Sequence, residues 1–461
     1  MKKILLLPVA AGALAGATGC DYHVSSFSGG WSDADLKAAT NLTQTAGIPA
    51  GLQGLDVSNC FGTIRITGAG NATAAWTWKL AVRARSEAVA QQIAAGASCQ
   101  TKLDGGHLTL MVWLPESKEP HSIQSDLEIT VPKSASVQAQ NRFGRTEIAD
   151  LTGEVGATNE NGRLDIRNIG GSVAARTSFA TLSVSNTGPA ALQDQNGKIQ
   201  ATGIGGPLEA RTSFASLLAQ DIRGAASLAN QNGKIQATGI RDLLRAETSF
   251  DSLVARDVGG AATLRNQNGR IEAAGISGPL DAKTSFASLA AQDIAGPVRL
   301  RNQNGGIKVQ QAKGDADIET SFDSLRVEGI QGDAILKNQN GGVVAGGISG
   351  SVQASTSFAA LEMTGAGSKF VCHNQNGAIR LRATSAALTN IEATTSFGTL
   401  EVHLAAGLKP AVQARTTFAD VESDFPVLMK PRGEDPFAGI APDTARVSLQ
   451  NQNGRIRVVR D

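Results

Sequence analysis

Three aspartates recur at equal intervals along the chain, and a sugar-cleaving enzyme would need carboxylates that cluster in a groove. Asp221, Asp257 and Asp293 are 36 residues apart, and paired carboxylates act as general acid and nucleophile or base in glycoside hydrolysis. If 36 residues span two stacked layers of strands, successive copies lie about 10 Å apart. That separation is too large for a carboxylate pair, and glycine alternates with aspartate at this position, as expected of a turn. We therefore predict turn residues here, and no enzyme.

The sequence predicts no metal site and no cofactor. The Asn-Gln-Asn-Gly phrases could form a calcium loop, but they lack the carboxylates that such a loop supplies. A net charge of +1 gives no reason to expect nucleic acid as a partner. The five histidines share no spacing typical of ligands: His23, His107, His121, His373 and His403.

Residues 1–20 are predicted to be a lipoprotein signal peptide. A basic start, Lys2 and Lys3, precedes an apolar stretch from residue 4 to residue 17. The sequence Ala-Thr-Gly-Cys that ends at Cys20 resembles a bacterial lipobox, in which small residues precede a cysteine that becomes lipidated. Cys20 is therefore the predicted lipidation site, and the membrane is a predicted partner through this anchor. Ordinary cleavage after Ala17, which would leave Cys20 as a free thiol, is the alternative.

The remaining three cysteines allow two structural predictions. Cys60 and Cys99 lie in the same N-terminal region, and they could form a disulfide in an oxidising compartment. Two buried, reduced thiols are the alternative. Cys372 occupies a repeat position that is otherwise apolar, so we predict a buried thiol there and not a nucleophile.

Two short phrases, Thr-Ser-Phe and Asn-Gln-Asn-Gly, alternate along most of the chain. Their marker residues, the Phe and the second Asn, are almost always 18 residues apart, which gives about 17 units between residues 143 and 453. The units contain short runs of alternating apolar and polar residues and no helical period. A fixed period of this length predicts a solenoid. We therefore predict a mainly β protein, a parallel β-solenoid (β-helix) of about 17 coils of 18 residues. A right-handed path is favoured, and the left-handed path stays open.

The alternation within the repeat predicts how the coil interior is filled. With units numbered 1 to 18 from Asn230 or Thr248, position 15 changes from large to small between units, as from Leu244 to Ala262, while position 17 does the reverse. Position 3 alternates Phe with Asn, so we predict another interior column there, which two adjacent phenylalanines would overpack. Glycines at positions 4, 10 and 13 are expected to provide positive φ angles or tight turns at corners. The predicted ladder at position 3 includes Phe214, Asn232, Phe250, Asn268, Phe286 and Asn304.

The N-terminal region differs from the repeats. Trp76 and Trp78 alternate with polar residues along a predicted strand, so both should pack in a core. Residues 86–96 form the one convincing helix, with Ser86 as its N-cap. Residues 59–68 resemble one unit of the repeat. A small α+β cap on the first coil is what a solenoid requires.

The organisation of the chain follows from these patterns. The charged strand at residues 455–461 is predicted to be the final, open coil, where charge discourages aggregation. The predicted segments are a signal peptide at 1–20, a polar tether at 21–52, an N-terminal α+β cap domain at 53–141, and a β-solenoid at 142–461 with an inserted loop at 423–445.

Three glycine-punctuated phrases carry a family resemblance: "NCFGTIRITG" at 59–68, "NRFGRTEIADLTG" at 141–153 and "NENGRLDIRNIGG" at 159–171. With the α+β segment and the stacked short strands, they resemble the bacterial putative-adhesin family of β-strand-repeat envelope proteins. The resemblance covers roughly residues 55–461. It implies a location in the cell envelope and a role in adhesion or envelope stress, and it transfers no catalytic residue.

The predicted function is that of a non-enzymatic lipoprotein, an adhesin or structural binding solenoid with a protein or glycan ligand. An envelope-stress signalling scaffold and a polysaccharide-active β-helix enzyme are the alternatives. The predicted location is the bacterial envelope, either on the periplasmic side of the inner membrane or at the outer membrane or surface. Asp21, directly after Cys20, favours the inner membrane if the cell is Gram-negative.

Overall fold

The computed structural model describes residues 36–70, 74–428, 435 and 437–461. The chain is mainly β, with 59% of its residues in strands and 2% in helix. It forms a parallel β-solenoid of about 15 turns with a small N-terminal part, close to the predicted 17 coils. Two compact units, residues 1–224 and 225–461, are described in turn.

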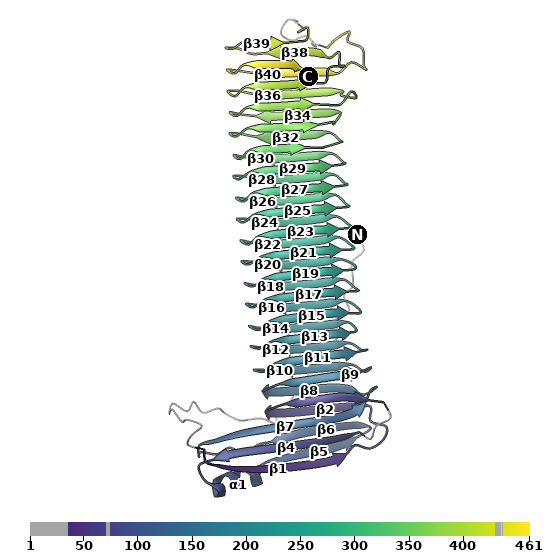
Figure 1. Ribbon diagram of the computed structural model, residues 1–461, viewed down its shortest axis with the longest axis vertical. Helices are drawn as coiled ribbons and strands as arrows, with labels where there is room; N and C mark the ends of the chain where they lie inside the picture. Colours follow the sequence, from purple (N-terminus) through teal and green to yellow (C-terminus); the bar gives the residue numbers. More distant parts are fainter. Residues whose placement is uncertain (1–35, 71–73, 429–434, 436) are drawn as a thin grey trace. The chain divides into compact units, whose positions relative to one another are not determined.

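The N-terminal part of the first unit combines antiparallel strands with the beginning of the solenoid (Figure 1). β4 pairs antiparallel with β1 and β7, and β5 pairs antiparallel with β6. β2 and β3 instead run parallel to β8 and β9, so residues 59–68 do form a coil of the repeat. The elements of this part are β1 (Ala38–Gly47), β2 (Gly54–Phe61), β3 (Ile64–Ala69), β4 (Ala75–Ala84), α1 (Glu87–Gly96), β5 (Ser98–Asp104), β6 (His107–Trp113), β7 (His121–Pro132), β8 (Ser136–Phe143) and β9 (Thr146–Leu151).

The predicted helix and tryptophan packing are confirmed. The side chain of Ser86 accepts a hydrogen bond from the backbone N–H of Val89 and caps α1. Trp76 and Trp78 are buried, and the Trp78 indole donates to the Ser125 hydroxyl at 2.8 Å. Within the described ranges no helix is long and apolar enough to cross a membrane.

The predicted tether is wrong over its second half. Residues 38–47 form β1, paired along its whole length with β4, and Ile48 and Leu52 are buried. The strand was missed because most of its side chains are exposed, so the sequence lacks the apolar alternation of a half-buried strand.

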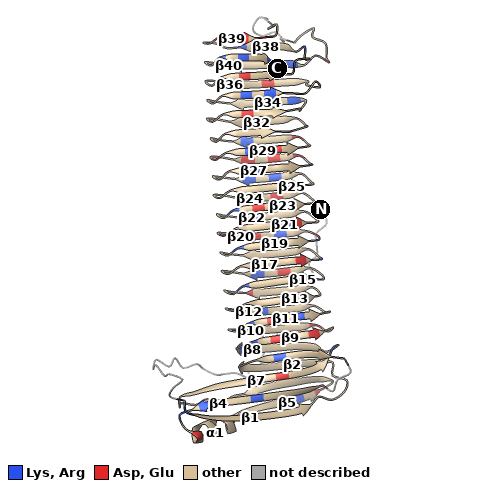
Figure 2. Ribbon diagram, viewed as in Figure 1, with Lys and Arg blue, Asp and Glu red and all other residues tan. Residues whose placement is uncertain are grey.

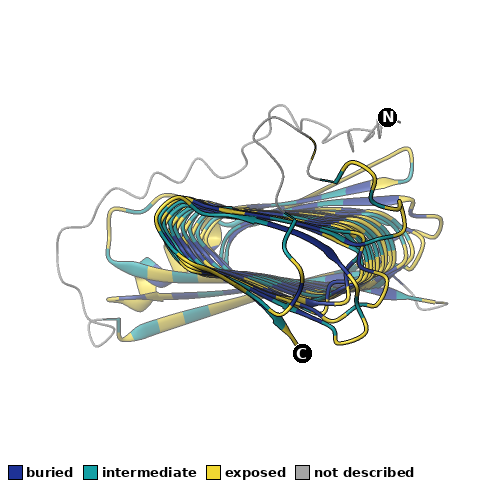
Figure 3. Ribbon diagram, turned by 90° about the horizontal axis from the view of Figure 1, so that it is seen from above, coloured by how far each residue is buried: buried dark blue, intermediate teal, exposed yellow. Residues whose placement is uncertain are grey.

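The remaining coils each contribute two strands, one to each of two parallel sheets that face one another across the interior (Figure 3). The coil strands of the first unit are β10 (Val155–Asn159), β11 (Leu164–Ile169), β12 (Val173–Thr177), β13 (Leu182–Thr187), β14 (Ala190–Asp194), β15 (Ile199–Ile204), β16 (Leu208–Thr212) and β17 (Leu217–Ile222).

The second unit is built from the same kind of two-strand coil. Its strands are β18 (Ala226–Asn230), β19 (Ile235–Ile240), β20 (Leu244–Thr248), β21 (Leu253–Val258), β22 (Ala262–Asn266), β23 (Ile271–Ile276), β24 (Leu280–Thr284), β25 (Leu289–Ile294), β26 (Val298–Asn302), β27 (Ile307–Ala312), β28 (Ala316–Thr320), β29 (Leu325–Ile330), β30 (Ala334–Asn338), β31 (Val343–Gly346), β32 (Val352–Thr356), β33 (Leu361–Gly365), β34 (Lys369–Asn374), β35 (Ile379–Ala383), β36 (Asn390–Thr395), β37 (Leu400–Leu404), β38 (Ala411–Arg415), β39 (Val421–Ser423), β40 (Arg446–Asn451) and β41 (Ile456–Arg460).

The predicted exchange of large and small residues inside the coils is confirmed at positions 15 and 17. Leu244 pairs with Ala262, which pairs in turn with Leu280, and all three are buried. A large side chain thus lies beside a small one along the column, which fills the interior without voids.

Position 1, at the end of the even-numbered strands, forms a second buried column of alternating Asn and Thr. Asn266 donates through Nδ2 to the main-chain oxygen of Asp251 at 2.7 Å and accepts through Oδ1 from the Gly269 N–H at 2.9 Å. Thr284 in the next coil donates to the main-chain oxygen of Gly269 at 2.9 Å. These side chains satisfy corner backbone groups that would otherwise be buried without partners.

Glycine has two different roles at the corners. Gly239 and Gly275, at position 10, have φ angles of +68° and +66°, as predicted. Gly269, at position 4, has no such angle; a Cβ there would lie 2.1 Å from the main-chain oxygen of Asp251. Close contact between consecutive coils, and not backbone conformation, therefore requires glycine at position 4.

The C-terminal strands do not form the last coil, so that prediction is wrong. β40 pairs with both β36 and β38, and β41 with both β37 and β39. The terminal layer is therefore 411–423, and Arg457 on β41 forms ion pairs with Glu401 and Glu422 on either side. The described residues between Ser423 and Arg446 contain no strand.

Candidate binding surface

The phenylalanines at position 3 are on the surface, which overturns the predicted interior column. In the second unit five of them, between 60% and 61% exposed, recur at every second coil. We call this set the Phe ladder: Phe250, Phe286, Phe322, Phe358 and Phe397. Phe179 and Phe214 of the first unit have the same exposure, 62% and 59%.

The corner geometry explains why these rings point outward. Along β20 the side chains alternate sides, and Thr248 at its end is buried. Residues 249–251 then bend, so the alternation does not extend to Phe250. The interior column that alternates is position 1, two residues before the marker used to count the repeat.

The asparagines at position 3 lie against the corner instead of projecting from it. Asn268 donates through Nδ2 to the main-chain oxygen of Ser249, in the preceding coil, at 3.1 Å. Asn304, Asn340 and Asn376 make the same bond to their preceding serines at 3.0–3.1 Å. Asn232 is also half-buried. The amide at position 3 thus bonds the neighbouring corner, although its side chain is not inside the coil.

The rings of the Phe ladder are separated from one another by gaps, and backbone hydrogen bonds hold the corners that carry them. Consecutive rings are two coils apart, which is about 10 Å on strand spacing. The Ser249 N–H donates to the Gln231 oxygen at 3.0 Å, and the Asn268 N–H donates to the Ser249 oxygen at 2.8 Å. The corner that carries Phe250 is therefore bonded to the coils on both sides, which holds the ring on a rigid base.

The aspartates that suggested catalysis are turn residues. Asp221, Asp257 and Asp293 all have φ angles of +55°, a left-handed conformation that Asp tolerates better than most residues. Asp257 Oδ1 lies 3.0 Å from the place where Gly275, in the next coil, would carry a Cβ. Aspartate and glycine therefore alternate because the aspartate side chain occupies the space beside the glycine, where a Cβ would otherwise lie.

The histidines do not gather into a ligand set. Over the described ranges, no group of three or more His, Cys, Asp or Glu residues could hold a metal ion, and His23 lies outside them. His403 Nδ1 is 2.9 Å from Asp461 Oδ1, and Arg382 Nε donates to Asp461 Oδ2 at 2.7 Å. Hydrogen bonds with His403 and Arg382 lower the pKa of Asp461, so these residues form a surface ion network that holds the C-terminus.

The predicted Cys60–Cys99 disulfide is wrong, because Cys99 is a free, buried thiol. Cys372 is a free, buried thiol as predicted. Burial raises the pKa of Cys99 to about 11 and that of Cys372 to about 12, which makes both poor nucleophiles. Cys20 lies outside the described residues.

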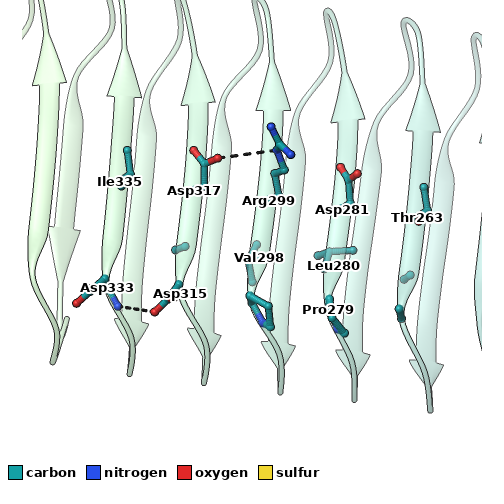
Figure 4. Close-up of a pocket in the computed structure, with 14 residues that line it drawn as sticks. Thr263, Pro279, Leu280, Asp281, Val298, Arg299, Asp315, Asp317, Asp333 and Ile335 are labelled. Carbon is teal, nitrogen blue, oxygen red and sulfur yellow. Dashed lines mark hydrogen bonds and ion pairs between the residues drawn. The ribbon is translucent and has the colours of Figure 1, made fainter. Parts of the chain in front are cut away.

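A shallow depression of about 440 Å³ lies over the outer face of the even-numbered strands β22, β24, β26, β28 and β30. Its charged residues are Asp281, Arg299, Asp315, Asp317 and Asp333 (Figure 4). Arg299 forms an ion pair with Asp317 at 3.8 Å, and Asp315 accepts a hydrogen bond from the Asp333 N–H at 2.9 Å. Charges of both signs are mixed along the coil faces (Figure 2). This arrangement joins neighbouring coils and presents no activated nucleophile.

No family model matches the chain, and no curated protein matches it. Two solved structures resemble it. A putative adhesin from Bacteroides fragilis NCTC 9343 has 15% sequence identity and a TM-score of 0.29, over 60% of this chain and 97% of that one. A putative cell adhesion protein from Clostridium sporogenes ATCC 15579 has 8% identity and a TM-score of 0.15, over 92% and 100%. Both names agree with the sequence resemblance.

Proposed function

We propose that the protein is a non-enzymatic, lipid-anchored adhesin of the bacterial cell envelope, and that the Phe ladder is its adhesive surface. The observation that carries this proposal is the exposure of five rings at equal intervals along one hydrogen-bonded corner. Five large apolar side chains exposed in one regular row offer a repeated apolar contact surface to a partner. Aromatic residues are also enriched among the side chains that dominate binding energy.

The other surfaces support binding over catalysis. The recurring aspartates have turn conformations, and the carboxylates of the depression include several already engaged with neighbouring coils. Catalysis by carboxylates requires a pair placed on either side of a substrate. Binding by a ladder of rings requires only that the rings be held on a rigid support, and the stacked coils supply that support.

The anchor is supported by the sequence that precedes Cys20. Lipidation would place the N-terminal end of the chain at a membrane and leave the repeats free to extend from it. Several acyl chains on one cysteine hold a protein firmly, whereas a single chain does not.

Attachment of whole cells tests the adhesive surface, with polystyrene as an apolar probe. Cells producing the full chain are compared with cells producing Phe286→Ser/Phe322→Ser/Phe358→Ser. The matched control, Leu243→Ser/Ile335→Ser/Val344→Ser, removes three exposed apolar side chains that lie away from the ladder. Protease treatment of intact cells first establishes that the chain is accessible. Attachment lost only in the ladder variant supports the proposal, and equal attachment of all three strains contradicts it.

Membrane fractionation tests the anchor. The full chain should partition with membranes, and Cys20→Ala should release it. The mass of the N-terminal peptide from non-reduced protein decides the chemistry of Cys20. A diacylated peptide supports the anchor. A peptide that begins at Thr18, or one that joins Cys20 to Cys60 by a disulfide, contradicts it, because a sulfur in a disulfide cannot carry the lipid.

A further inference from the structure

We propose that the occupant of the Phe ladder is a second copy of this chain, with the rings of one ladder inserted between the rings of the other. This inference deepens the proposed function and rests on it: adhesion would join protein on one surface to identical protein on another. Four observations on the described corner carry it.

The gaps of the ladder have the size of an aromatic ring. Consecutive rings are about 10 Å apart, and the intervening asparagines lie back against the corner through their bonds to serine oxygens. A ring from outside, placed midway, would lie about 5 Å from two partners. Aromatic pairs favour centroid separations of about 4.5–7 Å.

The molecule already contains the packing that this insertion would create. Phe61 and Phe143 occupy the marker position in two coils that are adjacent in space. Their rings stack with centroids 5.1 Å apart and an interplanar angle of 6°. Two phenylalanines on neighbouring coils therefore stack instead of clashing, contrary to the sequence-based expectation. A second ladder shifted by one coil would reproduce this pair at each gap of the Phe ladder.

The period of the ladder selects its partner. A foreign polymer must match a repeat of about 10 Å over several steps, whereas a second copy has the same repeat by construction. Self-complementary contact of one patch with itself is also the usual geometry of dimers. The ladder therefore fits another copy that is shifted by one coil, because the two repeats then match at every step.

The area and charge of the corner suit such a contact. A phenylalanine offers about 200 Å², so five rings at this exposure bury about 1,200 Å² in total over two copies, the lower bound of a stable interface. Across the nine three-residue corner segments from 249–251 to 396–398, positions 2–4 of each coil, only Asp251 and Asp323 are charged. Little like-charge repulsion thus opposes the approach of two ladders.

Sedimentation velocity of the full chain over a wide range of concentration tests the inference. All proteins carry Cys20→Ser, so that lipid cannot cause association. The parent chain and the control Leu243→Ser/Ile335→Ser/Val344→Ser should associate as concentration rises. Phe286→Ser/Phe322→Ser/Phe358→Ser should weaken association roughly tenfold or more, because it removes three central anchors.

A gap-filling variant separates interleaving from other uses of the rings. Asn304→Phe/Asn340→Phe adds apolar surface but occupies two gaps from within, as the Phe61–Phe143 pair does. Interleaving predicts that this variant loses self-association although it is more apolar. Stronger association would overturn the inference, and so would a parent chain that stays monomeric. If the parent is monomeric while the ladder variant still abolishes attachment to polystyrene, the ladder binds a different partner and only the self-recognition fails.

Discussion

The side-chain nitrogen of Asn266 donates to the main-chain oxygen of Asp251, 2.7 Å away in the preceding coil. The same amide donates to the oxygen of Arg270 at 3.4 Å and accepts from the N–H of Gly269. One buried side chain thus satisfies three backbone groups at a corner. Threonines in the intervening coils continue the column, so each corner is tied to the next, and the ladder of rings just outside it stands on a fixed base.

Asn266→Ala should loosen this corner locally. The Gly269 N–H would lose its acceptor, and the oxygens of Asp251 and Arg270 would lose a donor. Leaving buried polar groups unpaired costs about 1–3 kcal/mol. Hydrogen exchange at Gly269 should therefore become about tenfold faster or more, whereas Gln267→Ala, at an exposed side chain, should leave it unchanged. Equal protection in both variants would show that the amide is dispensable.

Asp194 takes the place of an asparagine in this column, and Asp194→Asn should stabilise the protein. Its Oδ2 is buried and has no hydrogen-bond partner. Desolvation raises the pKa of Asp194 above its ordinary 3.8, against backbone hydrogen bonds that lower it. An amide nitrogen in place of Oδ2 could donate to a corner oxygen, as that of Asn266 does.

The gain from Asp194→Asn should depend on pH with a definite sign. A raised folded-state pKa means that the contribution of Asp194 to stability is fully present below pH 3.8 and is lost as pH rises through the folded-state pKa. At neutral pH the free energy of unfolding of the variant should therefore exceed that of the parent by about 1–3 kcal/mol. In acid the two free energies should be nearly equal. Thermal unfolding at both pH values measures this; a gain that is larger in acid would reverse the assignment.

Cys372 should be inert in the folded chain. Burial raises its pKa from 9.0 to about 12, and the thiolate is the reactive species. Iodoacetamide at mildly alkaline pH should label Cys372 only after unfolding, as read by peptide mass. Because the folded-state pKa is raised, the stabilising contribution of this thiol should be complete below pH 9 and decline as pH rises toward about 12. Rapid labelling of native protein would place the thiol in a mobile or open region.

The sequence predicts the period of this fold better than the side on which each residue lies. The exchange of Leu244 and Ala262 follows strand alternation, so its interior location could be inferred. Phe250 is separated from β20 by a bend, and alternation gives no information across a bend. The alternation of Phe and Asn at position 3 is the most regular feature of the sequence, yet the prediction places it on the wrong side of the coil.

The order in which the last coils stack also could not be predicted from the sequence. β40 and β41 insert between two coils that precede them, an arrangement set by pairing between distant strands. The same reason applies to β1. Its exposed side chains give no apolar pattern that predicts a strand, and its position is set by pairing with β4. Local pattern defines a coil, whereas long-range backbone pairing decides which segments stack.

Phe250→Ala tests whether the rings of the Phe ladder lie on the surface. Adhesion and self-recognition both depend on this. At 60% exposure, removing the ring should cost about 0.5 kcal/mol or less, as is usual for surface changes. Leu253→Ala, three residues along in the same coil, removes a fully buried side chain and should cost about 2–5 kcal/mol. Chemical denaturation of dilute protein should therefore leave the midpoint nearly unchanged for Phe250→Ala and lower it clearly for Leu253→Ala. If both variants lost the same stability, the ring would be packed inside the coil, and neither adhesion nor self-recognition could be assigned to the ladder.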